Sequence, residues 1–172
     1  SPPDKRLCRL GPAVNEFGGA FRMQYQSDDP VAEFNSRAEG RLPGLLGIEM
    51  IEFTGERYES RMMIEPHHHA PNGFLHAASI VALADTTCGF AARTRLPEGS
   101  SGFTTVELKS NHMGTLLQGE LRCTATAVHI GRSTQVWDAR VFDPAKDRTI
   151  AVFRCTQMVL WPKEDKPAGA GS

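Results

Sequence analysis

The sequence has 172 residues, of which 40% are hydrophobic and 23% charged, and its formal net charge is −1. This size and composition are typical of one globular domain, and the balanced charge gives no electrostatic support for binding nucleic acid or an anionic membrane. The four cysteines are widely spaced and form no CxxC motif, which favours reduced thiols in a cytoplasmic protein over a disulfide framework or a zinc site.

The first part of the chain predicts a lead-in, a helix and a hairpin. Residues 1–27 are rich in glycine, proline and polar residues without a clear period, so we expect a flexible segment. Asp29 followed by Pro30 is typical of a helix start, and this helix should end near Gly40. The next expected elements are a turn at 42–44, a strand at 48–54, a Gly55-Glu56 turn and a second strand at 57–64.

A long apolar helix is expected next, from the turn at Asn72 and Gly73 to about Arg93. Its apolar residues occupy nearly every side, which predicts burial, and the polar residues that interrupt it argue against a membrane span. One carboxylate, Asp85, lies inside it, and no residue three or four positions away carries a positive charge. Because burying an unpaired carboxylate is costly, Asp85 is a candidate functional group.

The start of this helix supplies a second candidate group. His76 and Ala77 stand in the first turn, where backbone N–H groups lack a partner within the helix and favour negative charge. A base and free N–H donors are the two halves of an acyl-transfer site. Ala77 and Asp85, however, are eight residues apart, or about 12 Å along the helix axis. We therefore expect a site shared between two copies, with Ala77 from one and Asp85 from the other.

Four strands are expected to complete one antiparallel sheet. The segment 120–130 alternates, which predicts that Leu121, Cys123, Ala125 and Ala127 share one face. The layout is α+β, with the sheet wrapped around the long helix over residues 28–161, and its open edge predicts a homodimer. Residues 162–172 are expected to be disordered. The four strands are expected at 103–113, 120–130, 133–142 and 148–161.

Residues 72–85, NGFLHAASIVALAD, resemble the signature of the hotdog-fold thioesterases of the PaaI-like (phenylacetate-pathway) type. Members of that family show G-x-x-H-G-G, with Asp or Glu nine residues after the histidine, as Asp85 follows His76 here. The segments GFTTVELKSNHM and HIGRSTQVWDARV resemble the next strand and the hairpin after it. The likeness covers about residues 45–161 and implies a hotdog fold.

The resemblance implies hydrolysis of an acyl-coenzyme A thioester without metal or cofactor, coenzyme A being part of the substrate, by a homodimer that pairs into a tetramer. It implies that Asp85 is the general base or nucleophile and that the Ala77 backbone N–H, next to His76, polarises the thioester carbonyl. It also implies that the Thr105 hydroxyl places the water or the carboxylate, and that Arg132 contacts a phosphate. The residues it suggests along the substrate channel are His69, Asn72, Gly73, His112, Met113, His129, Gly131, Arg132 and Ser133.

Two positions depart from the family pattern. Ala77 replaces a glycine, and Ala70 stands where members usually carry Asn or Gln, so His69 or Asn72 is a candidate substitute. These departures keep open a non-catalytic acyl-CoA-binding protein, and a hydratase or dehydratase with an Asp–His pair is the other alternative. Three consecutive histidines at 67–69 are not interpreted as a metal site, because adjacent side chains point to alternate sides. Cys88 is interpreted as a small buried hydrophobe.

Overall fold

The computed structural model describes residues 28–162. The lead-in predicted at 1–27 and residues 163–172 of the predicted tail lie outside this range. Both long helices and all six strands expected within it are confirmed. The helices are α1 (Pro30–Ala38), α2 (Leu42–Leu45) and α3 (Ala77–Thr94), with a 3-10 turn η1 (Pro66–His68); the strands are β1 (Ile48–Phe53), β2 (Tyr58–Met63), β3 (Gly102–His112), β4 (Glu120–Ile130), β5 (Thr134–Asp143) and β6 (Arg148–Leu160).

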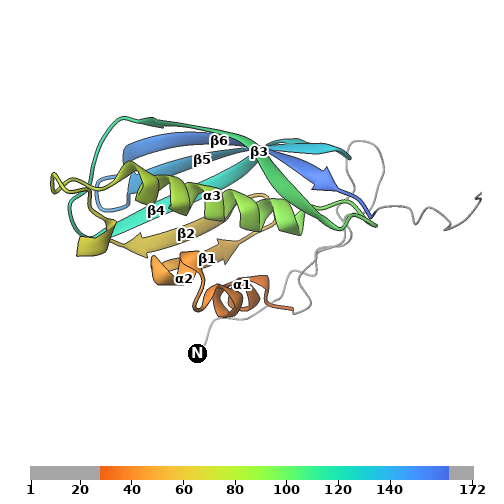
Figure 1. The fold of residues 1–172 in the computed structure, drawn as a ribbon, viewed down its shortest axis with the longest axis horizontal. Coiled ribbons are helices and arrows are strands. Elements are labelled where there is room, and N and C mark those ends of the chain that lie inside the picture. Colours follow the sequence, from red (N-terminus) through yellow and green to blue (C-terminus); the bar gives the residue numbers. More distant parts are fainter. Residues whose placement is uncertain (1–27, 163–172) are drawn as a thin grey trace, which may run out of the picture.

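The six strands form one antiparallel sheet in the order β1-β2-β4-β5-β6-β3. The sheet curves around α3, which runs along its inner face, while α1 and α2 lie beside β1 and the same long helix (Figure 1). This is the expected α+β layout. No helix in the range 28–162 is long and apolar enough to cross a membrane.

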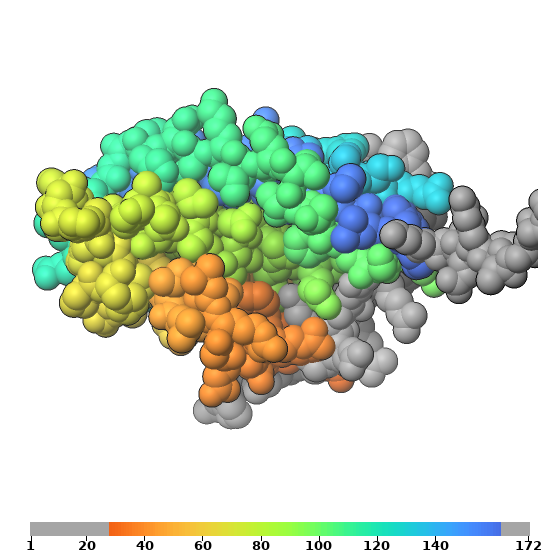
Figure 2. Space-filling model, viewed as in Figure 1, coloured from red at the N-terminus to blue at the C-terminus, as the bar shows by residue number. Residues whose placement is uncertain are grey.

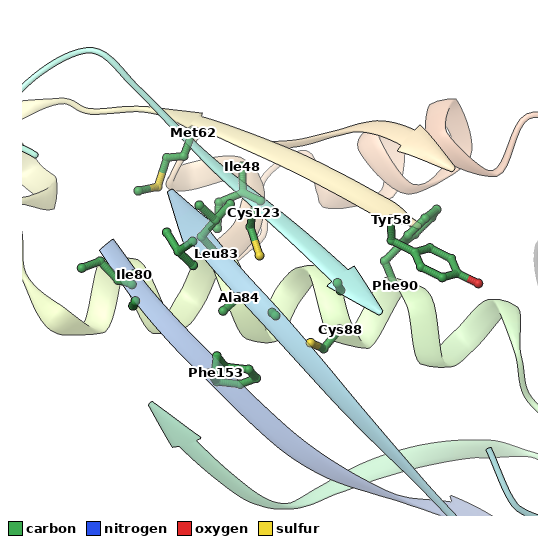
Figure 3. Close-up of a cluster of buried hydrophobic side chains, with 14 of the residues drawn as sticks. Ile48, Tyr58, Met62, Ile80, Leu83, Ala84, Cys88, Phe90, Cys123 and Phe153 are labelled. Atoms are coloured by element: carbon green, nitrogen blue, oxygen red, sulfur yellow. The ribbon is translucent and has the colours of Figure 1, made fainter. Parts of the chain in front are cut away.

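The core lies between α3 and the sheet. Leu83, Cys88 and Phe90 of α3 are buried against side chains of the strands, among them Tyr58 and Met62 of β2 (Figure 3). Each fully buried Leu or Phe contributes roughly 1.5–3 kcal/mol, so this contact fixes the helix on the sheet. The expected burial of Cys88 is confirmed.

One stripe of α3 is not covered by the sheet of its own chain. Ala77 and Ala78 are exposed, whereas Asp85, Thr86 and Gly89 are only half-buried. These positions recur at helical spacing, because the curved sheet wraps only part of the helix surface. The prediction that the helix is buried on nearly every side is therefore wrong for a single chain.

Two details of the backbone bear on smaller expectations. Residues 42–44, expected to form a turn, belong to the one-turn helix α2, since Pro43 occupies a first-turn position where its missing N–H costs nothing. In β4 the register with β5 shifts between Ala127 and His129. The bulge comes after Ala127, which still pairs in regular register with the buried Trp137, so Ala127 is on the predicted face with Leu121, although it is itself exposed.

The two edges of the sheet differ in how they are covered. At the β1 edge, the Asn35 side chain of α1 donates to the Met50 carbonyl and accepts from the Met50 N–H, both at 2.9 Å. This mimics a neighbouring strand and protects the edge. At the other edge, β3 pairs only with β6 within the described residues, and exposes Val106 and Leu108. β3 is therefore the edge open to another chain.

Candidate active site

Asp85 lies in the middle of the uncovered stripe of α3. Its Oδ1 atom is buried and has no hydrogen-bond partner among residues 28–162. Burial raises the pKa of the Asp85 carboxyl above the ordinary value of 3.8. A carboxylate that is desolvated and unbonded is a stronger base than one held in an ion pair. This environment matches the sequence argument for a functional acid.

Asp85 faces a pocket of about 350 Å³ between α1, α2, α3 and β3. These elements meet on one face of the molecule, where Figure 2 shows α1 and α2 in orange, α3 in yellow-green and β3 in green. Thr105 lines the same pocket, so the structure brings these two predicted site residues together. The other lining residues are Phe34, Arg37, Ala38, Arg41, Pro43, Thr86, Gly89, Phe90, Arg93 and Phe103.

The Thr105 hydroxyl has a defined orientation. It donates a hydrogen bond of 2.8 Å to the Gln157 side-chain carbonyl on β6. Since the hydroxyl has one proton, its oxygen is left as an acceptor toward the pocket. Thr105 is thus equipped to accept a hydrogen bond from a water molecule placed beside Asp85.

The helix start is built around His76 and the carbonyl of His68. The His76 ring Nδ1 accepts from the Ala78 N–H at 2.9 Å, so this side chain is the N-cap of α3. The His68 carbonyl accepts from the His76 N–H and from the Ser79 hydroxyl, both at 2.9 Å. Ala77 is exposed, and its N–H has no acceptor within the described part of the chain. A free donor is therefore held at the positive end of the helix dipole.

Two of the three histidines before the helix, His68 and His69, hold the loop in place. The buried His68 ring accepts from the Glu65 N–H at 2.8 Å and donates to the Leu46 carbonyl at 3.0 Å. Burial, followed by the neighbouring His67, lowers the pKa of His68, which fits a neutral ring. His69 bonds to the Leu117 carbonyl at 2.9 Å. Within residues 28–162, no group of three or more His, Cys, Asp or Glu side chains is arranged to hold a metal ion.

Asn72 and Gly73 form the turn into α3. The Asn72 side chain accepts from the Phe74 N–H at 3.2 Å, and Gly73 has φ of +83°, a left-handed conformation that glycine adopts without strain. Neither Asn72 nor His69 lines the Asp85 pocket within one chain. The two candidate substitutes for the residue missing at Ala70 are therefore engaged at the helix start.

The remaining predicted residues lie at two ends of the molecule. At the β4–β5 hairpin, the Arg132 guanidinium lies 5.0 Å from the centre of the Trp161 ring, and a Cβ on Gly131 would come within 2.6 Å of the His129 ring. Gln135 donates to the Arg95 carbonyl, which puts this hairpin, with Ser133, at the C-terminal end of α3 (Figure 1).

His112 and Met113 lie at the opposite end. Met113 opens the loop that carries Leu117, and His69 bonds to that loop next to the start of α3. One chain therefore does not bring the hairpin residues to the Ala77 N–H.

A larger groove of about 880 Å³ lies on the outer face of the sheet. Its acids are ion-paired: Asp138 with Arg154 at 2.5 Å, and Asp147 with Arg140 at 2.9 Å. These two carboxylates are therefore already occupied by guanidinium groups. The smaller pocket at Asp85 is therefore the better candidate site, although the outer groove has the larger volume.

Sequence reasoning missed the walls of the Asp85 pocket that come from α1 and α2. Phe34, Arg37 and Arg41 are more than forty residues from Asp85. The sequence predicted the helix that carries Phe34 and Arg37, but not its position. Arg93, on α3 itself, had a readable signal, because it follows Asp85 by about two helical turns.

A sheet wrapped around a long helix, with a lone acid in the middle of that helix, is the arrangement of a hotdog-type enzyme. Comparisons with known proteins give the same class. Residues 72–150 match the thioesterase superfamily. The putative esterase ComA2 of Bacillus subtilis is 33% identical over 115 residues, covering 67% of this chain and 90% of ComA2. The 1,4-dihydroxy-2-naphthoyl-CoA hydrolase of Escherichia coli is 29% identical over 126 residues, covering 73% and 91%.

The crystal structure of thioesterase HI1161 from Haemophilus influenzae superposes with a TM-score of 0.73 at 27% identity, covering 78% of this chain and 93% of HI1161. The chain therefore belongs to the thioesterase superfamily. The predicted hotdog fold and thioester-hydrolase class are confirmed.

Proposed function

We propose that this enzyme hydrolyses an acyl-coenzyme A thioester to the free acid and coenzyme A in the cytoplasm, without a cofactor. The observation that carries the proposal is the Asp85 carboxyl beside a pocket of a thioesterase fold: its Oδ1 atom is buried without a hydrogen-bond partner among the described residues, and burial raises its pKa. A base of this kind suits the activation of water near neutral pH. The name of the Escherichia coli relative, a CoA-ester hydrolase, supports coenzyme A as the thiol.

In the proposed reaction, Asp85 takes a proton from water whose oxygen bonds to the thioester carbonyl carbon, or Asp85 attacks that carbon directly. Thr105 accepts a hydrogen bond from the water. The Ala77 N–H stabilises the oxyanion, a contribution of about 3 kcal/mol for one such donor. The C–S bond then breaks, and the coenzyme A thiolate leaves and takes up a proton. If Asp85 is the nucleophile, water hydrolyses the anhydride that it forms.

The site is completed by a second copy of the chain. Within one chain Ala77 and Asp85 lie about 12 Å apart along α3, too far for one carbonyl to reach both. Two-fold pairing across the open β3 edge supplies the partner subunit's Ala77 to Asp85. The uncovered stripe of small residues on α3 then faces the partner. We also propose that two such dimers associate into a tetramer.

The same pairing gives the coenzyme A moiety a channel. The β4–β5 hairpin, at the C-terminal end of α3 in one chain, approaches the helix start of its partner. His129, Gly131, Arg132 and Ser133 then line the channel with residues from the partner's helix start and from the end of β3. Arg132, stacked on Trp161, presents its guanidinium to a phosphate.

The proposal is tested by the release of coenzyme A thiol from a panel of aromatic, short-chain and medium-chain acyl-CoA thioesters. Wild type should hydrolyse at least one, and Asp85→Asn should lower kcat by at least about 100-fold. Asp138→Asn is the matched control, since Asp138 lies on the outer face of the sheet in a surface ion pair. An Asp85→Asn enzyme with undiminished kcat, or a wild type that binds acyl-CoA and hydrolyses none, would contradict the proposal.

A further inference from the structure

Gln157 is a buried polar residue on a strand face that is otherwise apolar. Side chains that alternate with it along the inner face of β6 are buried as well, and these are Ala151, Phe153, Cys155 and Val159. Gln157 itself has no exposed surface. Burying an amide is costly, and a methionine or leucine would fill this place without that cost. The Gln157 amide therefore calls for a role of its own.

Both ends of the Gln157 amide are hydrogen-bonded. Its Oε1 atom accepts from the Thr105 hydroxyl at 2.8 Å, and its Nε2 atom donates to the Cys155 sulfur at 3.4 Å. Because Cys155 is fully buried on the same strand, it holds the amide nitrogen on the side away from Thr105. The amide oxygen is thereby directed at Thr105, whose single hydroxyl proton is used in this bond.

The backbone of β3 places Thr105 beside the proposed base. Thr105 is paired directly with Gln157, and the register between β3 and β6 shifts immediately afterwards, before Glu107. Bulges of this kind redirect side chains and are frequent next to active sites. Thr105 and Asp85 line the same pocket, and Asp85 Oδ1 has no hydrogen-bond partner among residues 28–162. A Thr105 proton released from Gln157 would therefore have the Asp85 carboxylate as an acceptor in that pocket.

We infer that Gln157 is a positioning residue, which orients the hydrolytic water through Thr105. This inference rests on the proposed function. By accepting the Thr105 proton, Gln157 keeps Thr105 from donating to Asp85 and leaves the Thr105 oxygen as an acceptor. The water then donates one hydrogen to Asp85 and the other to Thr105, so its lone pair is free to attack the thioester carbonyl carbon. As the water oxygen bonds to that carbon, Asp85 takes up the proton.

The inference is tested with Gln157→Met, which keeps the length of the side chain and removes the acceptor. The Thr105 hydroxyl should then donate to Asp85, and a hydrogen bond to the ionised carboxylate lowers its pKa. We expect kcat for acyl-CoA hydrolysis to fall by about tenfold, the scale of one hydrogen bond, and the acid limb of kcat/KM to move to lower pH. Thr105→Val should lower kcat to a similar extent without moving the limb. The double variant should keep the limb of Thr105→Val and lose little further kcat, because both residues act through one hydroxyl.

Gln135→Met is the matched control. Gln135 is also fully buried and lies opposite Gln157 in the β5–β6 ladder, but it bonds to the Arg95 carbonyl and the Trp137 ring N–H. Its substitution should lower the Tm and leave the acid limb in place.

The charged and titratable groups around Asp85 are the same in all of these variants. Those that line its pocket or interact with it electrostatically, within the described part of the chain, are Arg37 of α1, Arg41 before α2, Arg93 and Cys88 of α3, and Cys155 of β6. A shift of the acid limb therefore reports a change in hydrogen bonding to Asp85.

The outcomes separate this inference from the proposed function. An unchanged kcat in Gln157→Met, or a limb that moves as far in the double variant as in Gln157→Met, would overturn the inference and leave acyl-CoA hydrolysis standing. A limb that moves to higher pH in Thr105→Val would also overturn it, because Thr105 would then donate to Asp85 in wild type. That measurement provides the test even if Gln157→Met does not fold. If wild type hydrolyses no acyl-CoA, both proposals fail.

Discussion

The Ala77 N–H and the Asp85 carboxylate lie on the same helix, on the stripe that the sheet of their own chain leaves uncovered. Each is a polar group without a partner in the described chain: one is a donor at a helix start, and the other a buried acid. Unbonded polar groups are costly, and two on one stripe indicate a surface completed by something else.

Replacing Asp85 with Asn should stabilise the fold, and more so at higher pH. Because burial raises the folded-state pKa of Asp85 above its unfolded value, the associated stability is fully present below the unfolded pKa and is lost as pH rises through the folded pKa. The Asn side chain avoids that loss. The Tm of Asp85→Asn should therefore exceed that of wild type by more at about pH 8 than at about pH 4. A difference that shrinks with rising pH would contradict a desolvated Asp85.

The pH dependence of activity should report the same group. Asp85 acts only when ionised, so kcat/KM should rise with pH along an acid limb whose midpoint lies above the ordinary value of 3.8. Initial rates with a single acyl-CoA, buffered at constant ionic strength, give this limb. An acid limb at or below the ordinary value would mean that Asp85 is solvated or paired in the assembled enzyme.

His76 should act by capping the helix and not through chemistry of its ring. His76→Ala removes the acceptor for the Ala78 N–H, so it should cost about 1 kcal/mol of stability and lower kcat by displacing the Ala77 N–H. His76→Asn keeps a side-chain acceptor at the N-cap, so its stability and its kcat should both be close to those of wild type. Thermal melts and acyl-CoA hydrolysis on the same preparations check this. An Asn variant as stable as wild type but as inactive as the Ala variant would assign the ring a catalytic role.

The sequence predicted the elements better than it predicted the pocket. The strands alternate at period two and are bounded by turn residues, and Asp85 was identifiable because its helix is otherwise apolar. The one-turn helix α2 and the bulge after Ala127 were missed, since both are set by tertiary contacts over a few residues. Arg37 and Arg41 reach the pocket only because α1 packs beside β1 and α3, which no local pattern encodes.

Asn35 should be needed to keep the β1 edge closed. Asn35→Ala removes two hydrogen bonds to Met50, which should lower the free energy of unfolding by about 1–3 kcal/mol and expose the strand edge. Urea unfolding measures the first effect, and light scattering should detect assemblies larger than those of wild type. Gln118→Ala, which changes an exposed amide in the loop after β3, is the control. It should change neither the free energy of unfolding nor the size of the assemblies. Unchanged stability in Asn35→Ala would mean that α1 alone covers the edge.

The shared site predicts that two inactive variants complement each other. Asp85→Asn removes the base and Ala77→Pro removes the N–H donor. Proline is tolerated at the first position of a helix, and His76 before it already has the extended backbone, ψ of 134°, that a residue preceding proline requires. Each variant alone should be folded and inactive.

After the two variants are unfolded and refolded together, random pairing should make about half of the dimers mixed, and each mixed dimer carries one intact site. Activity should then return to about a quarter of that of an equal amount of wild type. Refolding each variant alone is the control, and mass spectrometry of isotopically labelled chains confirms that mixed dimers form. Mixed dimers without activity would show that Ala77 and Asp85 do not act across the two-fold. Activity in the Ala77→Pro homodimer would show that another group binds the oxyanion.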